Sequence, residues 1–360
     1  MRGEEPHSMI SNSDKSIQKY LTPYRYSRPV VHGSGKKGAF DEKSVDIPFV
    51  FWHQGRYYMI YTGYDGIGYQ SALASSNDLI HWRFQGLILK RCPESTRWDK
   101  NGGAVTWVLK SDDRFAAMPK LRKVEGRYWL IYHSYPGEGY EDGAAEIGMA
   151  WCEDEKLLEW HYLDQPIFSW KAGKSWEAGG LYKACMIEKG GFWYLFYNAK
   201  NKAEHWKEQI GMAVSKDFFH WQRIEGNPIL KNSQHGWDQT FVSDPYILRD
   251  GDKWLCFYYG IGKQEEDGLY HAEEGLAVSE DLLHWEKVEA PILRHGAEGA
   301  FDHHHAHKPA IFYENGILYH FYCATCQASP EYPTELFGEY RTICVAASAI
   351  PDQQKGWVRV

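Results

Sequence analysis

Hydrophobic and polar residues alternate in short runs along most of the chain, and the runs recur in a fixed order. Each unit has a turn glycine followed by an aromatic run, as at residues 55–61 and 126–132. A run of small residues follows, as at 275–279, and ends near a His-Trp pair such as His284-Trp285. Alternation with a period of two is the pattern of half-buried strands. The one short helix we predict lies at residues 13–20.

An aromatic residue followed by an acid opens each unit, and this pair occurs five times. The five pairs are Phe40-Asp41, Trp98-Asp99, Trp176-Glu177, Trp237-Asp238 and Phe301-Asp302. Repeats of this length with four strand signals are typical of β-propellers. Because one small sheet cannot cover both of its apolar faces, blades pack around a common axis. We predict an all-β fold, a five-bladed β-propeller of four-stranded antiparallel blades at 28–360, after an N-terminal arm at 1–27.

Charge and composition exclude several classes of protein. The net charge is −8 and no basic run is long enough to neutralise a nucleic-acid backbone, so we expect no nucleic-acid partner. No apolar run approaches a membrane span and no signal-peptide core is present, so we expect a cytoplasmic protein without a membrane partner. The seven cysteines form no disulfide framework.

The innermost strand of each propeller blade lines the axis, and polar residues at its start converge on one pocket. Asp46 and Asp244 lie close to prolines within apolar runs that we place on inner strands. A carboxylate is costly to bury there unless it has a use. The alternative is that each acid caps a neighbouring backbone amide. For blade two, we place the inner strand at residues 115–121.

Glu177 is open to two interpretations. It occupies the aromatic-acid position of the repeat, where the other four acids are read as structural. It is also the only glutamate among them, and Gly179-Gly180 would let a ligand approach closely.

Residues 303–307 read His-His-His-Ala-His, and alternate residues of a strand share one face. Such histidines could bind a metal, donate hydrogen bonds to a sugar or act as a general acid. We select His305 as the catalytic candidate of this run. The substrate-binding residues that we predict are His303, His307, Trp107 and Tyr182.

The strings at 40–48, 55–63 and 277–285 resemble those of the five-bladed propeller glycosidases of glycoside hydrolase families 43, 62, 32, 68, 117 and 130. The resemblance covers about residues 28–360. The motifs of fructoside-cleaving members are incomplete, since Asp46 lacks a preceding Asn and Asp244-Pro245 follows a Ser. We therefore rank fructosidases low. Residues 177–183 are similar to the acid segment of family 43.

The resemblance implies a general base, a general acid and a third carboxylate that raises the pKa of the acid. Placed on this chain, it suggests Asp46 as the base, Glu177 as the acid and Asp244 as the modulator. His305 would contact the sugar or replace Glu177, because family 117 uses a histidine as its acid. Family 130 includes phosphorylases, in which His303, His305, His307 and Lys308 would hold phosphate.

We expect an exo-acting glycoside hydrolase whose partner is a short plant- or algal-derived oligosaccharide, arabinofuranosidase/xylosidase-like or anhydrogalactosidase-like. The alternatives are a glycoside phosphorylase and a non-catalytic carbohydrate-binding propeller. A binding propeller tends to repeat its site in every blade, whereas the inner runs here differ. We expect no required cofactor, and leave room for a structural Ca²⁺ or another divalent ion in the central channel.

Overall fold

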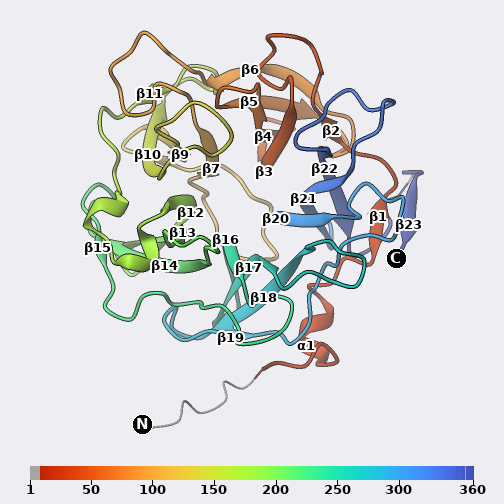
Figure 1. Cartoon of the computed structure of the whole chain (residues 1–360). Coiled ribbons are helices and arrows are strands. Elements are labelled where there is room, and N and C mark those ends of the chain that lie inside the picture. The colour runs from red at the N-terminus through yellow and green to blue at the C-terminus, as the bar shows by residue number, and fades with distance from the viewer. Residues whose placement is uncertain (1–8, 353) are drawn as a thin grey trace.

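A computed structural model of the chain describes residues 9–352 and 354–360. Strands arranged as blades around a central axis make up almost the whole described molecule (Figure 1). The α-helix α1 (Lys15–Gln18) lies within the segment predicted to be helical, and the 3-10 turns η1 (Trp170–Ala172) and η2 (Ser175–Glu177) precede blade three. Within the described ranges, no helix has the length and apolar character of a membrane span.

Each blade is an antiparallel sheet whose first strand is innermost. Blade one contains β3 (Ser44–His53), β4 (Arg56–Tyr64), β5 (Tyr69–Ser76) and β6 (Arg83–Leu89). Blade two contains β7 (Ala104–Val108), β8 (Lys123–Val124), β9 (Arg127–Ser134), β10 (Glu146–Cys152) and β11 (His161–Tyr162). Blade three contains β12 (Gly180–Lys189), β13 (Phe192–Lys200), β14 (Glu208–Ser215) and β15 (Gln222–Arg223). Blade four contains β16 (Phe241–Asp250), β17 (Lys253–Ile261), β18 (Ala272–Ser279) and β19 (Glu286–Lys287).

The fifth blade joins the two ends of the described chain. Its strands are β20 (His305–Glu314), β21 (Ile317–Gln327) and β22 (Glu339–Ala347), together with β1 (Tyr24–Tyr26), β2 (Val31–His32) and β23 (Trp357–Arg359). β1 pairs with β22 on one side and with β23 on the other. Part of the predicted arm is thus a strand of the last blade. The prediction of an all-β, five-bladed propeller is confirmed.

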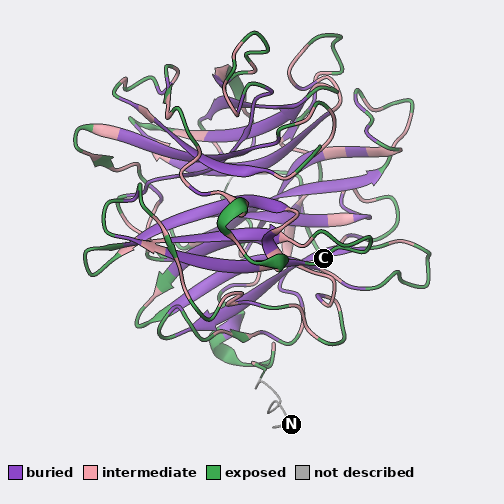
Figure 2. Ribbon diagram, turned by 60° about the vertical axis from the view of Figure 1, so that its left-hand side comes forward, coloured by how far each residue is buried: buried purple, intermediate pink, exposed green. Residues whose placement is uncertain are grey.

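The aromatic-acid repeat has a packing function. In blade two, Trp98 stacks on Tyr132 with ring centroids 5.6 Å apart, and a Cβ at Gly148 would lie 2.6 Å from each ring. The Tyr132 hydroxyl donates to Asp99 at 2.6 Å. The same bond from a tyrosine of the second strand recurs in three further blades, as Tyr197 to Glu177, Tyr258 to Asp238 and Tyr322 to Asp302. In these four blades the repeat therefore encodes contacts that close the sheet, and the strands of the propeller are largely buried (Figure 2).

Every inner strand carries an irregularity in its pairing near its start. In β3 the register shifts between Asp46 and Phe49, and the other inner strands shift at corresponding places. A β-bulge bends a strand and redirects its side chains. The residues with positive φ at these bulges are Ile47, Lys183, Asp244 and Lys308. Three of these four are charged, so the bulges direct charge towards the axis.

The predicted inner strand of blade two was wrong. The strand that lines the axis there is β7, and residues 115–121 form a connection that touches other blades. Lys120 bridges to Trp52 of blade one, and the Phe115 ring packs on Tyr20 and Phe257. Phe115 and Pro119 are buried, and Met118 and Leu121 are partly buried, so the apolar residues of this connection resemble those of a strand when only the sequence is seen.

Candidate active site

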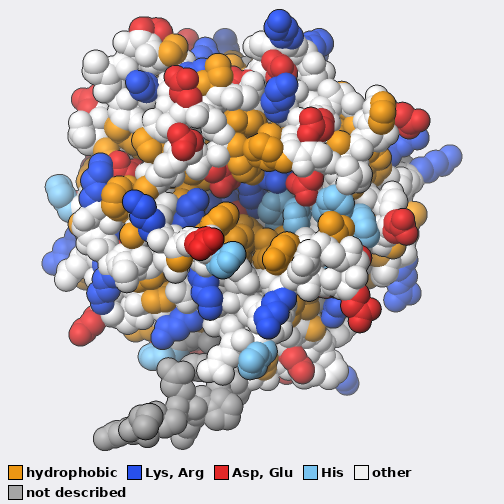
Figure 3. Space-filling model, viewed as in Figure 1, with side chains coloured by type: hydrophobic (Ala, Val, Ile, Leu, Met, Phe, Trp, Pro, Cys, Tyr) orange, Lys and Arg blue, Asp and Glu red, His pale blue; other side chains and the backbone are white. Residues whose placement is uncertain are grey.

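The starts of the inner strands meet at one end of the axis, which we call the site mouth. Figure 3 shows this face hollowed at its centre, with basic and histidine side chains gathered around the hollow. The charged residues at the bulges, together with groups on β14, β9 and β22, account for most of this chemistry.

Asp46 is the centre of an ionic cluster between blades one and five. Its Oδ2 lies 2.6 Å from Lys308 Nζ and 3.3 Å from Arg341 Nη1, and the residue is 1% exposed. Its Oδ1 also accepts from the Ile47 amide at 2.8 Å, so the capping interpretation holds alongside the ionic one. Burial by itself would raise the pKa of Asp46, but the two cations outweigh it and hold the pKa well below its usual range. Asp46 is therefore ionised at neutral pH.

Asp244 lies on the bulge of β16 in a different setting. Its Oδ1 is 3.0 Å from Ser243 Oγ and 3.5 Å from Asn198 Nδ2, and its Oδ2 is 4.0 Å from Lys183 Nζ. The pKa of Asp244 is raised to about 6, because burial and the nearby Glu208 carboxylate together outweigh the opposing effect of Lys183 and Lys308. Asp244 therefore holds its proton to a much higher pH than Asp46.

Glu208, at the start of β14, completes this second cluster, and it is absent from the residues selected on the sequence. Its Oε2 accepts from Ser243 Oγ at 2.7 Å and from Asn198 Nδ2 at 3.0 Å. Tyr259 donates to the same oxygen at 3.5 Å. The only signal in the sequence is an acid at the start of the apolar run 210–214, in a third strand, whereas our selection was confined to first strands.

The histidines of residues 303–307 do not act as one group. His305 accepts the Ala272 amide proton at Nδ1 (3.1 Å), so its own proton sits on Nε2, 3.5 Å from Glu339 Oε1. Burial lowers the pKa of His305 to about 4. His307 is buried, with Nδ1 3.0 Å from the Cys323 carbonyl oxygen. His303 lies apart, with Nδ1 3.3 Å from the Gly296 carbonyl oxygen.

Tyrosines line the same end of the axis. Tyr182, a predicted substrate-binding residue, packs with Tyr135 and His133 and donates to the Gly179 carbonyl at 2.7 Å. Burial and the cations of Lys308 and Lys183 lower the pKa of His133 to about 3, so this ring is neutral. Tyr140, from the loop after β9, is within 2.8 Å of Arg341 Nη1 in blade five and so crosses the site mouth.

The structure does not bring Glu177 and Trp107 into this constellation. Both Glu177 carboxylate oxygens lie 3.0 Å from Arg223 Nε, and Tyr197 donates to one of them at 2.5 Å. These partners belong to the middle and outer strands of blade three. Trp107 is 1% exposed, and its ring packs edge-on against Phe49 and Tyr246 in the core. Both residues thus take part in packing the blades.

Two groups of side chains in the described ranges have the composition of metal ligands. The first is Asp46, His307 and Cys323 at the axis. Two cations already bind the Asp46 carboxylate, and burial raises the pKa of the Cys323 thiol well above its usual value. Charge repulsion and a protonated thiol both disfavour a divalent ion there. The second group, at Glu265, His271 and His295, lies outside the axis.

Two carboxyl groups with opposite protonation states are what glycoside cleavage requires. One protonates the departing oxygen, and the other activates water or attacks the sugar. Below about pH 6, Asp244 is protonated while Asp46 is ionised, and both lie on the bulges of inner strands.

The matching family model and the similar solved structures place the protein in the class of five-bladed propeller enzymes of the glycosidase type, as the sequence resemblance predicted. The chain belongs to the family described as "Glycosyl hydrolases family 32 N-terminal domain", whose model matches residues 119–302. Blade one, which contains Asp46, lies outside the matched residues. That the protein does not cleave fructosides stays a prediction from the sequence motifs.

Three similar proteins show how closely the chain matches known sequences and structures. A solved structure described as "Glycoside hydrolase" is 26% identical with a TM-score of 0.78, covering 98% of this chain and 98% of its own. A solved family 130 protein, from work on mannoside phosphorylases and glycoside hydrolases that target β-1,2 mannosidic linkages in Candida mannan, has a TM-score of 0.64 at 14% identity, covering 94% of this chain and 96% of its own. The 1,2-β-oligomannan phosphorylase of Thermoanaerobacter sp. (strain X514) is 27% identical over 34% of this chain and 42% of its own length, so the match spans less than half of that relative.

Proposed function

We propose that this protein is a glycoside hydrolase in which Asp244 is the general acid and Asp46 the general base. The observation that carries the proposal is the contrast between these two buried carboxyl groups. The pKa of Asp244 is raised to about 6, whereas two cations keep Asp46 ionised. Environments that push two carboxyl pKa values apart assign the acid and the base.

Hydrogen bonds around Ser243 support a proton on Asp244. The Ser243 hydroxyl lies between Glu208 Oε2 at 2.7 Å and Asp244 Oδ1 at 3.0 Å, and it has one proton to give. If it donates to Glu208, the contact with Asp244 is satisfied when Asp244 is protonated and donates back. Glu208 then takes the part of the third carboxylate, which the resemblance had suggested for Asp244. His305, neutral at pH 7, keeps the predicted contact with the sugar as a hydrogen-bond donor through Nε2.

The loop that crosses the site mouth supports the exo-acting part of the proposal. The loop that carries Tyr140 spans from blade two to Arg341 in blade five. The Tyr140 ring also packs edge-on against Phe337, with ring centroids 5.4 Å apart. A pocket crossed by a loop accepts the end of a short oligosaccharide, whereas a long chain needs an open groove. The plant or algal source of that oligosaccharide and the cytoplasmic location stay predictions.

Charge balance favours water over phosphate as the acceptor. Three cations take part in the ion pairs of the site mouth, namely Lys183, Lys308 and Arg341. The acids in contact with them or with their partners are Asp46, Asp244, Glu208 and Glu339. With Asp244 protonated, three negative charges match three positive ones. A phosphate would need positive charge beyond this balance. Phosphorolysis is nevertheless the second candidate, because one relative carries the name of a phosphorylase.

A panel of nitrophenyl furanosides, nitrophenyl pyranosides and end-labelled oligosaccharides, assayed with and without phosphate, tests the proposal. We expect release without phosphate, and a fall in kcat/KM of about 10²–10⁴-fold in Asp46→Asn. The matched control is Asp250→Asn, which makes the same change at the other end of the axis and should leave kcat/KM unchanged.

Release that requires phosphate would identify a phosphorylase. An Asp46→Asn variant with full activity and an intact circular dichroism spectrum would refute the assignment of the base. Saturable sugar binding in several equivalent sites, without turnover, would identify a carbohydrate-binding propeller.

A further inference from the structure

Two histidines and two carboxylates form a cluster on the rim of the propeller, between blades four and five. His271 ends the β17–β18 loop, and His295 lies in the loop that leads to β20. Their rings stack with centroids 3.8 Å apart and an interplanar angle of 12°. Ligand atoms of Glu265, His271 and His295 all lie within 4.8 Å of one another. Asp267 Oδ2 is 2.9 Å from His271 Nε2.

The hydrogen bonds of the two rings fix which nitrogen faces the cluster. His271 Nδ1 is 2.9 Å from the His304 carbonyl oxygen, so it carries a proton and donates. His295 Nδ1 is 3.1 Å from both the Gly296 and the His303 carbonyl oxygens and donates in the same way. The two Nε2 atoms are therefore the ones that face the cluster. That of His271 donates to Asp267 Oδ2 at 2.9 Å, so a metal would bind there in place of this proton. Donation from Nδ1 to a backbone carbonyl is the usual outer contact of a metal-binding histidine.

The carboxylates are held in place by a tight turn. The Glu265 amide donates to the Leu269 carbonyl at 2.8 Å, and the Gly268 amide donates to the Glu265 carbonyl at 3.0 Å. Asp267 Oδ1 accepts from the Leu269 amide at 2.9 Å, which leaves its Oδ2 towards His271. The turn thus places two carboxylates beside the two imidazoles.

We propose that Glu265, His271 and His295, with Asp267 beside them, bind one divalent transition-metal ion of the zinc type. Imidazole nitrogens and carboxylate oxygens are ligands that Zn²⁺ accepts, whereas Ca²⁺ and Mg²⁺ prefer oxygen alone. His271 is buried and Glu265 is exposed, so the ion would reach the site from the surface. The site is separate from the divalent ion considered for the central channel.

Such an ion would tie the β17–β18 loop to the segment that begins β20. The His271 ring donates to the His304 carbonyl, and the next residue, Ala272, donates its amide to His305 Nδ1. β18 and β20 also pair at Ala272 and His305. Metal binding would therefore stabilise the start of β20, the strand that carries His305 and Lys308, although the ion itself would not contact residues at the axis.

Metal binding is tested with Zn²⁺ in competition with a chromophoric chelator, and with Co²⁺, whose visible absorption reports nitrogen and oxygen ligation. We expect one equivalent per chain and a melting temperature that rises with Zn²⁺ concentration. Glu265→Gln, an exposed change that leaves the fold intact, and His295→Gln should each weaken binding at least about tenfold. The matched control is His284→Gln, which removes an exposed histidine paired with Asp281 at 2.7 Å.

Zn²⁺ affinity unchanged in both Glu265→Gln and His295→Gln would overturn the proposal. So would several weak equivalents that fall by one in His284→Gln, or no binding at all. None of these measurements depends on turnover, so the proposal stands or falls apart from the proposed hydrolase activity.

Discussion

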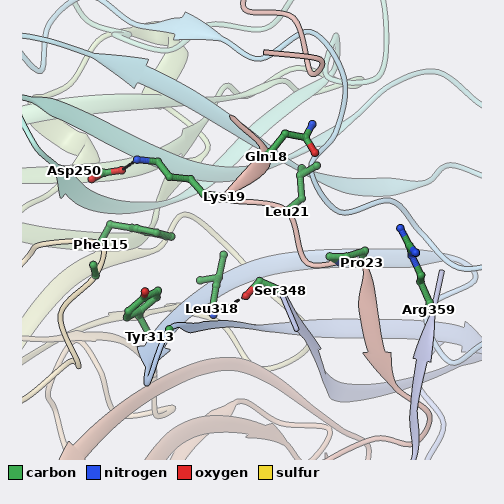
Figure 4. A pocket seen from close by; sticks show the side chains of 12 residues that line it. Gln18, Lys19, Leu21, Pro23, Phe115, Asp250, Tyr313, Leu318, Ser348 and Arg359 are labelled. Atoms are coloured by element: carbon green, nitrogen blue, oxygen red, sulfur yellow. Dashed lines mark hydrogen bonds and ion pairs between the residues drawn. The ribbon is translucent and has the colours of Figure 1, made fainter. Parts of the chain in front are cut away.

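The two ends of the propeller axis are built from the same inner strands, yet they differ in chemistry. At the site mouth, side chains of opposite charge are buried and join separate blades, as Lys308 joins Asp46. At the opposite end, which we call the far mouth, a cavity of about 570 Å³ opens between the N-terminal segment and the strand ends (Figure 4). Its lining includes Lys19, Asp250 and Tyr313.

The charged pair at the far mouth is an ordinary surface pair. Lys19 binds Asp250, but the side chains are 53% and 24% exposed, whereas those of Lys308 and Asp46 are 9% and 2% exposed. Exposed pairs contribute little, because water already solvates both charges. A sizeable cavity is thus present at the end with the weaker chemistry. What distinguishes a site here is buried charge on bulged strands, not the volume of the hollow.

Among the variants considered, Asp244→Asn at the site mouth should cause the largest loss of activity. It should lower kcat/KM by about 10²–10⁴-fold by removing the acid. In the wild type, kcat/KM should fall as pH rises through about 6, the pKa of Asp244. This alkaline fall of kcat/KM should be absent from the residual activity of the Asp244→Asn variant. A pH profile of both proteins measures this, and an unchanged limb in the variant would assign the acid elsewhere.

The same variant carries a prediction for stability. Folding raises the pKa of Asp244, so the folded state holds this proton more tightly than the unfolded chain does. The contribution of this group to the free energy of unfolding is therefore fully present at low pH and is lost as pH rises through about 6. Urea unfolding across this pH range should show a smaller decline for Asp244→Asn than for the wild type.

The Glu177→Gln variant tests whether Glu177 stabilises the fold or takes part in catalysis. Loss of the charge leaves Arg223 without its buried partner, so the free energy of unfolding should fall by about 3–5 kcal/mol. Activity at a temperature where the variant is folded should change little. Glu153→Gln, which breaks an exposed pair with Arg127, is the control and should cost less than about 1 kcal/mol. A folded Glu177→Gln protein with activity reduced a thousandfold would restore Glu177 as the acid.

Glu208→Gln should lower kcat/KM less than Asp244→Asn does, and it should act by shifting the pH dependence of kcat/KM. The Glu208 charge helps to raise the pKa of Asp244, so its removal should move the alkaline limb of kcat/KM to lower pH. At pH 7 we expect a loss of about three- to tenfold, since each unit of displacement is tenfold on that limb. A uniform loss with no displacement would mean that Glu208 contacts the sugar instead.

The smallest effect should come from the far mouth. Tyr20 donates to Asp250 at 2.5 Å, and Tyr20→Phe removes this bond while keeping the ring against Phe115. We expect a loss of about 1 kcal/mol in the free energy of unfolding and no change in kcat/KM. Thermal unfolding and the standard assay measure the two. A change in kcat/KM would show that the far mouth is coupled to the site mouth.

Particular residues mark how far sequence reasoning reached. Asp46 and Asp244 could be found because a carboxylate stands out in an apolar run. Glu208 and Arg341 could not, because they reach the axis from third strands, and only blade packing brings them there. Glu177 was misleading because its neighbouring glycines suggested access, whereas Arg223 and Tyr197 bury it.

The sequence by itself determined the number and composition of the blades, since each repeat opens with an aromatic residue and an acid, and in four of them a tyrosine of the same repeat bonds that acid. These contacts lie within one repeat, so they are visible as a period. Only the tertiary structure decided the site, because its defining contacts join residues as distant as Asp46 and Arg341. The pKa of each buried carboxyl depends on neighbours from other blades, and no local pattern records which blade will supply them.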